Sequence, residues 1–275
     1  MNEINPAQTA QHLKEINVYG YTHVENYLSS KQVDELKNLV CKYHDESKSI
    51  SLKGLPDRDV EDKTVYNLQN KHKTFIDLLG TPFIKTILSS KLNDPYYRFL
   101  PPDVPNYILS YFNARSSGKE LALHIDSHIP SPGDYTWAVQ LAFILDNQTE
   151  ENGCTVVVPG SHRSGSYTDR DLKNVKSILS RAGDLVIWDS RLWHGTRANI
   201  NKSSRWAIIA TFNMWWVKQA MDMPRSLPAD IYSLLSNEQK ALLGFCAITP
   251  PDEYDRINTK CGYDFLKPNL TDYHF

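Results

Sequence analysis

The chain has 275 residues, with 30 lysines and arginines against 32 aspartates and glutamates, and a formal net charge of −2. This balance predicts no binding of nucleic acid or of an anionic membrane, and the hydrophobic content of 41% is that of a globular protein. The four cysteines are scattered without a C-x-x-C pair, so neither a disulfide framework nor a zinc site is indicated. No apolar run approaches membrane-spanning length, and the first residues lack the basic and apolar regions of a signal peptide. We therefore expect a cytoplasmic protein.

The first 105 residues are predicted to be mainly helical. A short strand is expected at Tyr21–Val24, and Ser29 with Gln32 forms a capping box that would begin the next helix. That helix carries apolar residues at helical spacing, namely Val33, Leu36, Val40 and Tyr43. A later helical pattern is interrupted at residues 80–82, where glycine and proline stand close together.

From residue 106 the sequence favours β-structure, because short segments rich in β-branched and aromatic residues alternate with Gly, Pro, Ser and Asp. Strands are expected at Tyr107–Phe112, Leu121–Ile125, Tyr135–Leu145, Thr155–Val158, Asp184–Trp188 and Trp206–Trp216. Such a succession predicts a sandwich or jelly roll rather than a parallel α/β sheet. Capping signals at Ser236 and Gln239 predict helices near the C-terminus. We expect one domain over residues 1–275, with a helical part (1–105), a jelly-roll core (106–218) and a helical extension (219–275).

The segment Leu121–Asp126 alternates apolar and polar residues, so on a strand His124 and Asp126 would share one face. Alone, an H-x-D string is more often a hydrogen-bonded structural pair than a metal site. A third ligand from a distant segment would change this, and His194 is the best candidate. Two histidines and one carboxylate leave other coordination positions open, which suits a non-haem Fe(II) oxygenase.

Three other polar or aromatic features have ordinary interpretations beside functional ones. His128 would share a helical face with His124, but the alternation before it and Pro130 after it favour a loop residue or a group that supports the ligands. His162 follows a proline and a glycine, so a role in shaping that turn is favoured over metal binding. The Trp215–Trp216 pair could line a substrate pocket, although core packing is at least as common for such residues.

Arg205 stands at the start of an apolar stretch, Trp206–Ile209. A guanidinium flanked by strand residues is costly to bury without an anionic partner, and it can bind a carboxylate through two hydrogen bonds. Taken alone, Arg205 could equally form a surface salt bridge.

Together these motifs resemble the phytanoyl-CoA dioxygenase family of Fe(II)/2-oxoglutarate-dependent oxygenases. The similar segments are His124–Asp126, Thr149–His162, and His194–Asn199 followed by Arg205. The residues from Gly20 to Ser29 and from Leu242 to Phe245 are also similar to that family, so the resemblance covers most of the chain. Three motifs in the right order are a specific signal, although each alone is weak.

The resemblance implies a double-stranded β-helix (jelly-roll, cupin-like) core with flanking helices. It implies three metal ligands, His124, Asp126 and His194. It also implies four residues that bind 2-oxoglutarate, namely Arg205 and Thr196 at the distal carboxylate and, less specifically, Asn113 and Gln140 on flanking strands. The cofactors would be Fe(II), 2-oxoglutarate as cosubstrate, and O2.

The function implied is hydroxylation of a small molecule or natural-product intermediate, with release of succinate and CO2. Asp126 disfavours halogenation, because halogenating relatives replace this carboxylate. Desaturation, cyclisation or epoxidation would use the same site. A jelly-roll protein that binds metal or ligand without catalysis is the alternative from another class. A zinc hydrolase is disfavoured because no general base is evident near the three ligands.

Overall fold

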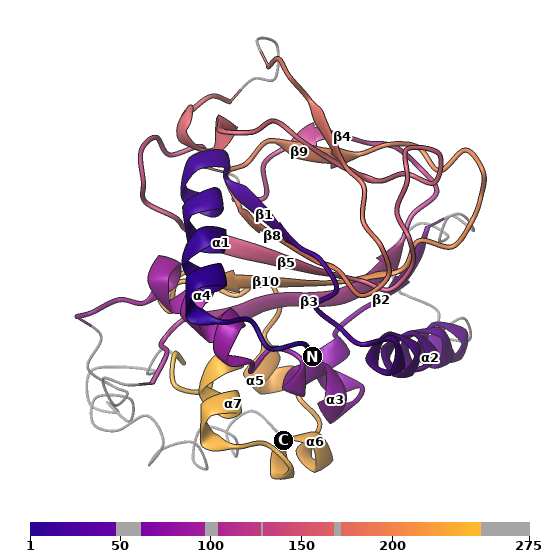
Figure 1. Ribbon diagram of the computed structural model, residues 1–275. Coiled ribbons are helices and arrows are strands. Elements are labelled where there is room, and N and C mark those ends of the chain that lie inside the picture. Colours follow the sequence, from indigo (N-terminus) through magenta and orange to yellow (C-terminus); the bar gives the residue numbers. More distant parts are fainter. Residues whose placement is uncertain (48–61, 97–103, 128, 168–171, 249–275) are drawn as a thin grey trace. The chain divides into compact units, whose positions relative to one another are not determined.

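The computed structural model describes residues 1–47, 62–96, 104–127, 129–167 and 172–248 (Figure 1). His128, expected in a loop or beside the ligands, lies outside the described residues, as does the end of the predicted C-terminal extension. The chain forms two compact units: the first lies within residues 1–66, 113–136 and 140–209, and the second within residues 67–112, 137–139 and 210–275. Within the described residues, none of the helices has both the length and the apolar composition needed to cross a membrane.

Two β-sheets build the first unit (Figure 1). The larger sheet has the order β1 (Tyr21–Val24), β8 (Leu185–Asp189), β5 (Ala138–Ile144), β10 (Ala207–Asn213), β3 (Ile108–Ser116) and β2 (Lys63–Val65). The smaller sheet has the order β4 (Leu121–His124), β9 (His194–Thr196), β6 (Thr155–Val157) and β7 (Lys176–Ile178). Strands β3, β5 and β10 each have part of their length in the second unit. The pairings β1–β8, β2–β3, β4–β9, β6–β9 and β6–β7 are antiparallel.

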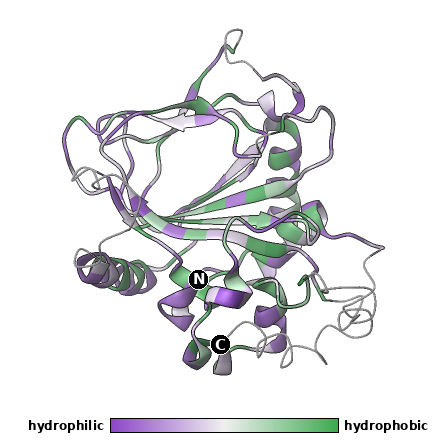
Figure 2. Ribbon diagram, turned by 180° about the vertical axis from the view of Figure 1, so that it is seen from behind, coloured by the Kyte–Doolittle hydropathy of each residue, from purple (hydrophilic) through white to green (hydrophobic). Residues whose placement is uncertain are grey.

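Side chains from both sheets meet in one apolar cluster, as expected when two antiparallel sheets pack face to face. The cluster contains Ala142, Ile144, Val157, Ile178, Val186, Trp188, Leu192 and Ala207, with Tyr21 and Ile209 packed against it. Every residue of β5 is buried, and the strands of the larger sheet carry many hydrophobic residues (Figure 2). The predicted mainly-β, jelly-roll core with flanking helices is confirmed.

The larger sheet also recruits strands from the part of the chain that was predicted to be mainly helical. The expected strand at Tyr21–Val24 is β1, and it pairs with β8 at one edge of the sheet. Strand β2 forms the other edge and was not predicted, since three residues carry too little pattern. The jelly-roll sheet therefore draws on residues before position 106.

The helices of the first unit begin where local capping signals stand. Helix α2 (Ser30–Ser47) follows the predicted box, in which the Gln32 backbone N–H donates to Ser29 Oγ and the Ser29 N–H donates to the Gln32 side chain. Helix α1 (Pro6–Tyr19) was not predicted, because only Thr9 and Ile16 are buried on it. Its signal was a second capping box, formed by Asn5 and Gln8.

The turn after β6 packs against the end of α1. His162 lies on the short helix η2 (Ser161–Arg163) and is buried, as suits its predicted role in shaping this turn. Its ring fills space beside Gly20, where a Cβ atom would lie 2.7 Å from His162 Nδ1. Gly20 also has a φ of 84°, which favours glycine at this helix end.

The second unit is built from short helices and from the ends of three strands. Its helical segments are η1 (Leu68–Asn70), α3 (Lys73–Asp77), α4 (Pro82–Leu92), α5 (Met223–Ser226), α6 (Ala229–Ser233) and α7 (Asn237–Leu242). Thr81 caps α4 and Pro82 is its first residue, so the predicted interruption at residues 80–82 is confirmed. The predicted capping box of Ser236 and Gln239 begins α7. Buried aromatic rings form part of its core, with Phe75 and Phe112 6.5 Å apart edge to face.

Candidate metal and cosubstrate site

The three predicted metal ligands meet at one end of the smaller sheet. His124 ends β4 and His194 begins β9, and the two residues are direct cross-strand partners. Their Nε2 atoms lie 3.4 Å and 3.3 Å from the two carboxylate oxygens of Asp126. One ligand atom from each of the three residues lies within 4.8 Å of the others. The pairing of β4 with β9 thus brings together two histidines that are about 70 residues apart in the sequence.

Both histidine rings are oriented by the backbone. His124 Nδ1 lies 2.9 Å from the carbonyl of Ala122, and His194 Nδ1 lies 2.9 Å from the carbonyl of Leu192. A carbonyl only accepts hydrogen bonds, so each Nδ1 carries a proton, and it is the neutral form of each ring that presents the Nε2 lone pair. This arrangement is the usual one for histidines that bind a metal.

Asp126 is held from the backbone as well. Its N–H and that of Ser127 donate to the carbonyl of Ser190, at 2.9 Å and 3.1 Å. The indole N–H of Trp188 donates to Asp126 Oδ2 at 3.3 Å. Gly195 allows β9 to lie this close to β4, because a Cβ atom there would collide with the carbonyl oxygen of Leu121.

The electrostatics of the three residues suit a divalent cation. Burial raises the pKa of Asp126, but the charge of His194 and hydrogen bonds from both histidines outweigh it and hold this pKa well below its usual range. The hydrogen bond to Asp126 is the main cause that raises the pKa of His124. A carboxylate that stays ionised and two imidazoles with aligned lone pairs form the donor set of non-haem Fe(II) sites. The residues present therefore fit the metal that the resemblance implies.

A cavity of about 90 Å³ adjoins the ligands and is called the Arg205 cavity below. His194, Thr196, Trp188 and Arg205 line it, together with small or apolar residues that include Ala142, Ala207 and Ile209. Since His194 is both a candidate ligand and part of the lining, a molecule in this cavity would lie beside one of the candidate ligands. The predicted residues His194, Thr196 and Arg205 are thus brought together.

Arg205 is a buried cation, with only 7% of its surface exposed. Its Nε donates to the carbonyl of Ser117 at 2.8 Å, and its Nη1 donates to the carbonyl of Gly153. Among the described residues, no carboxylate lies within ion-pair distance of it. Burial is the main cause that lowers its pKa to about 10, so the guanidinium still carries its charge at neutral pH. A buried, unpaired cation is costly unless an anion completes the site.

The other arginines near the site already have anionic partners. Arg191 forms a buried ion pair with Asp189, with 2.8 Å between Nη2 and Oδ2, and also donates to two backbone carbonyls. Arg197 faces Glu150 at 3.4 Å. Arg115 lines the Arg205 cavity but pairs with Asp62 at 3.7 Å. Arg205 is therefore the best candidate for binding a carboxylate ligand.

Thr196 has a hydroxyl that is free to donate. Its Oγ1 accepts a hydrogen bond from the Leu121 N–H at 3.3 Å, which leaves its own O–H for another acceptor in the cavity. Asn113 on β3 and Gln140 on β5 are each only 3% exposed, and neither is among the residues that line the Arg205 cavity. Their predicted part in cosubstrate binding remains a prediction.

Trp188 is a site residue that the sequence analysis missed. It was assigned to a strand, where an indole ordinarily packs in the core, and no local signal pairs it with Asp126.

The predicted aromatic pair, Trp215–Trp216, lies in the second unit. There the Trp215 indole N–H donates to Asp94 Oδ2 at 2.8 Å, and the ring of Trp216 lies edge-on to that of Trp137 at 5.4 Å.

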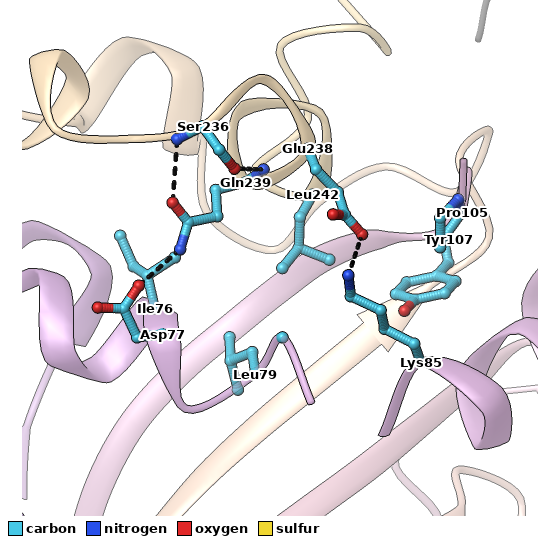
Figure 3. A pocket seen from close by; sticks show the side chains of 11 residues that line it. Ile76, Asp77, Leu79, Lys85, Pro105, Tyr107, Ser236, Glu238, Gln239 and Leu242 are labelled. Atoms are coloured by element: carbon cyan, nitrogen blue, oxygen red, sulfur yellow. Dashed lines mark hydrogen bonds and ion pairs between the residues drawn. The ribbon is translucent and has the colours of Figure 1, made fainter. Parts of the chain in front are cut away.

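The second unit has a cavity of its own, of about 330 Å³, shown in Figure 3 and called the Lys85 cavity below. Lys85 Nζ lies 2.6 Å from Glu238 Oε1. Gln239 Nε2 donates to Asp77 Oδ1 at 2.7 Å. The charged groups around this cavity therefore pair with neighbouring side chains, and the pairs join α7 to α3 and α4 (Figure 3).

The jelly-roll fold and the meeting of two histidines with a carboxylate define a class, the metal-dependent oxygenases with two histidines and one carboxylate as ligands. A sequence model of the family described as phytanoyl-CoA dioxygenase (PhyH) matches residues 16–207. The chain belongs to this family.

Relatives and solved structures agree with this assignment. The dioxygenase af480 of Aspergillus fumigatus is 26% identical over 255 residues, which cover 89% of this chain and 79% of that protein. The dioxygenase himG of Aspergillus japonicus is 23% identical over 218 residues, which cover 68% of this chain and 67% of that protein.

The fold is similar to those of α-ketoglutarate-dependent enzymes. The epimerase SnoN from nogalamycin biosynthesis has a TM-score of 0.60 at 18% identity, covering 77% of this chain and 85% of its own. HygX from Streptomyces hygroscopicus, with nickel, 2-oxoglutarate and hygromycin B bound, has a TM-score of 0.60 at 16% identity, with coverages of 76% and 88%. The protein is an Fe(II)/2-oxoglutarate-dependent dioxygenase, and its cofactors are Fe(II), 2-oxoglutarate and O2.

Proposed function

We propose that the protein hydroxylates a small molecule, such as a natural-product intermediate. In the balanced reaction, a substrate C–H bond, 2-oxoglutarate and O2 give a C–OH group, succinate and CO2. The observation that carries this proposal is the buried cation of Arg205, which lacks a carboxylate partner among the described residues and shares a cavity with His194.

The ligands, the cation and the apolar lining of the site would each have a separate role. His124, Asp126 and His194 would hold the iron, which supplies the redox chemistry with O2 that side chains lack. The Arg205 guanidinium would bind the distal carboxylate of 2-oxoglutarate, with Thr196 donating a further hydrogen bond. Apolar walls such as Ala207 and Ile209 would keep water from this ion pair and so strengthen it.

Hydroxylation is favoured among the outcomes that this class of site supports. Asp126 would supply a carboxylate ligand, so the position that a halide needs would be filled. A solved structure of EctD from S. alaskensis, with a TM-score of 0.59 at 16% identity, contains 2-oxoglutarate and 5-hydroxyectoine. The similar folds of SnoN and of the carbocyclase SnoK make epimerisation or ring closure the second candidate.

Oxygen labelling separates these outcomes. The purified protein with Fe(II) and 2-oxoglutarate would be screened against small molecules for those that stimulate succinate formation, and each positive reaction repeated under ¹⁸O₂. Hydroxylation predicts that one labelled atom enters succinate and the other enters the product. Epimerisation or ring closure would leave the label in succinate and none in the product.

A second arm of this experiment tests catalysis itself. An Arg205→Met variant should form little succinate at 2-oxoglutarate concentrations that saturate the wild type. Arg197→Met is the matched control, since Arg197 follows Thr196 in the chain but already has Glu150 as its partner. No succinate from the iron-loaded wild-type protein, with any compound, would support a binding protein without catalysis.

A further inference from the structure

Trp188 contacts two of the candidate metal ligands from within the core. Its indole N–H lies 3.3 Å from Asp126 Oδ2, and its ring centroid lies 5.3 Å from that of His194 at an interplanar angle of 54°. The residue lies on β8, and only 6% of its surface is exposed. Trp188 is thus placed by the core of the first unit and directed at the site.

The two oxygens of the Asp126 carboxylate have different surroundings. Oδ1 lies 3.4 Å from His124 Nε2, whereas Oδ2 lies 3.3 Å from His194 Nε2 and also receives the Trp188 N–H. When an ion takes the lone pairs of both Nε2 atoms, neither histidine can donate to the carboxylate through that atom. Among the described residues, the Trp188 N–H to Oδ2 is then the hydrogen bond that continues to hold the carboxylate.

We propose that Trp188 is a positioning residue that keeps Oδ2 of Asp126 away from the metal, so that Asp126 supplies a single oxygen ligand. The proposal rests on the proposed metal ligands. A carboxylate can bind an ion through one oxygen or through both. If Asp126 turned to bind through both, it would occupy a position that the two donor atoms of 2-oxoglutarate and O2 require. Trp188 thereby keeps the cosubstrate positions open.

The packing around Trp188 makes it suited to this task. Its neighbours in the apolar cluster include Ala142 on β5 and Ala207 on β10, whose small side chains leave room for the indole. Its backbone pairs with Tyr21 of β1 in the larger sheet. A donor fixed by core packing holds a ligand more firmly than one on a mobile loop.

The test removes the N–H and keeps the aromatic ring, through Trp188→Phe. The matched control is Trp193→Phe, because the Trp193 indole nitrogen is buried without a hydrogen-bond partner among the described residues. Each protein is loaded anaerobically with Fe(II), and 2-oxoglutarate is titrated while the visible metal-to-ligand charge-transfer band is recorded. The 2-oxoglutarate midpoint should rise about tenfold or more in Trp188→Phe and stay within about twofold in Trp193→Phe, as expected when a hydrogen bond to a ligand is lost.

Two further variants separate the hydrogen bond from packing. Trp188→Met also lacks the donor and should match Trp188→Phe, with thermal melting as the check on folding. Trp188→Gln places an amide N–H the same number of bonds from Cβ and should recover part of the affinity. A crystal structure of Trp188→Phe with Mn(II) should show both oxygens of Asp126 on the ion.

The outcomes distinguish failure of the Trp188 proposal from failure of the proposed metal and cosubstrate site on which it rests. If the wild type forms the band and Trp188→Phe has the same midpoint, with Asp126 bound through one oxygen, Trp188 has no positioning role. If the wild type binds Fe(II) and 2-oxoglutarate without forming the band, the metal and cosubstrate assignment fails, and this proposal fails with it.

Discussion

The Arg205 cavity and the Lys85 cavity differ in how their charges are satisfied. In the Lys85 cavity of the second unit, Lys85 faces Glu238 and Asp77 accepts from Gln239, so each charge has a side-chain partner. In the Arg205 cavity of the first unit, the guanidinium of Arg205 donates to two backbone carbonyls, and no carboxylate of the described residues lies within ion-pair distance. The cavity with the paired charges is the more spacious, at about 330 Å³ against about 90 Å³.

Under the proposed function, charge pairing identifies the binding site better than volume does. Paired groups at a half-exposed rim serve to join helices, and such pairs contribute little to stability. A buried cation without an anion is unfavourable in the empty protein and becomes favourable when an anionic ligand enters. The following predictions test whether the two cavities differ in this way, starting with the largest expected effect.

Removal of a metal ligand should have the largest effect. Asp126→Ala and His194→Ala should each abolish succinate formation, because two remaining ligands hold Fe(II) poorly. Iron content after desalting and 2-oxoglutarate turnover are the measurements. Normal iron content with turnover close to that of the wild type, in either variant, would rule out that residue as a ligand.

Loss of the unpaired cation should come next. Arg205→Ala should raise the KM for 2-oxoglutarate, since a buried carboxylate without its cation costs about 3–5 kcal/mol, or roughly 10²- to 10⁴-fold. Arg197→Ala is the control, because Arg197 already pairs with Glu150. The KM is read from succinate formation, and circular dichroism verifies the fold. An unchanged KM in Arg205→Ala would mean that another cation binds the cosubstrate.

Acid should weaken metal binding by a smaller and graded amount. The Asp126 carboxylate raises the pKa of His124 above its ordinary value of 6.5, so as the pH falls through this raised pKa a proton competes with the ion at Nε2. Asp126 has a lowered pKa and stays ionised over the same range. The apparent affinity for Mn(II) should therefore fall up to about tenfold per pH unit below the raised pKa, for the one proton displaced. Calorimetric titrations from pH 8 to about pH 5 measure it, and a constant affinity would contradict the proposed role of His124.

The smallest effect is expected in the Lys85 cavity. Lys85→Met or Glu238→Gln removes one partner of a pair whose side chains are 36% and 42% exposed. Solvent screens such a pair, so the free energy of unfolding should change by at most about 1 kcal/mol. Urea unfolding measures this change. A KM for 2-oxoglutarate that rises as much as in Arg205→Ala would show that the two cavities do not differ as described.

Much of the fold could be predicted where the signal is local. The capping boxes of Ser29 with Gln32 and of Ser236 with Gln239 begin helices as expected, because a few neighbouring side chains decide the start of a helix. The buried strands β5 and β8 were predicted within a few residues at each end. Strands β7 and β9 were missed, since three residues form a strand only where distant partners pair with them.

The candidate site could likewise be predicted only where its signal is local. Alternation within Leu121–Asp126 predicted that His124 and Asp126 would share one face of a strand. The strand ends at His124 and Asp126 lies in the turn after it, yet His124 Nε2 and Asp126 Oδ1 still lie 3.4 Å apart. His194 was the best distant candidate for the third ligand, and only the family resemblance implied that role, because its pairing with β4 joins segments about 70 residues apart. That Arg205 lacks an anionic partner while Arg191 and Arg197 have one depends on tertiary contacts, and so does the hydrogen bond from Trp188. No local pattern in the sequence encodes these contacts.

The central claim is that Arg205 and the three ligands bind one 2-oxoglutarate on one Fe(II). The most direct measurement is an anaerobic titration of the Fe(II)-loaded protein with 2-oxoglutarate, comparing the visible charge-transfer band of the wild type with that of Arg205→Met. We expect the band in the wild type and, in the variant, the same band at a midpoint at least about 10²-fold higher. Equal midpoints, or iron binding without any band in the wild type, would contradict this binding mode.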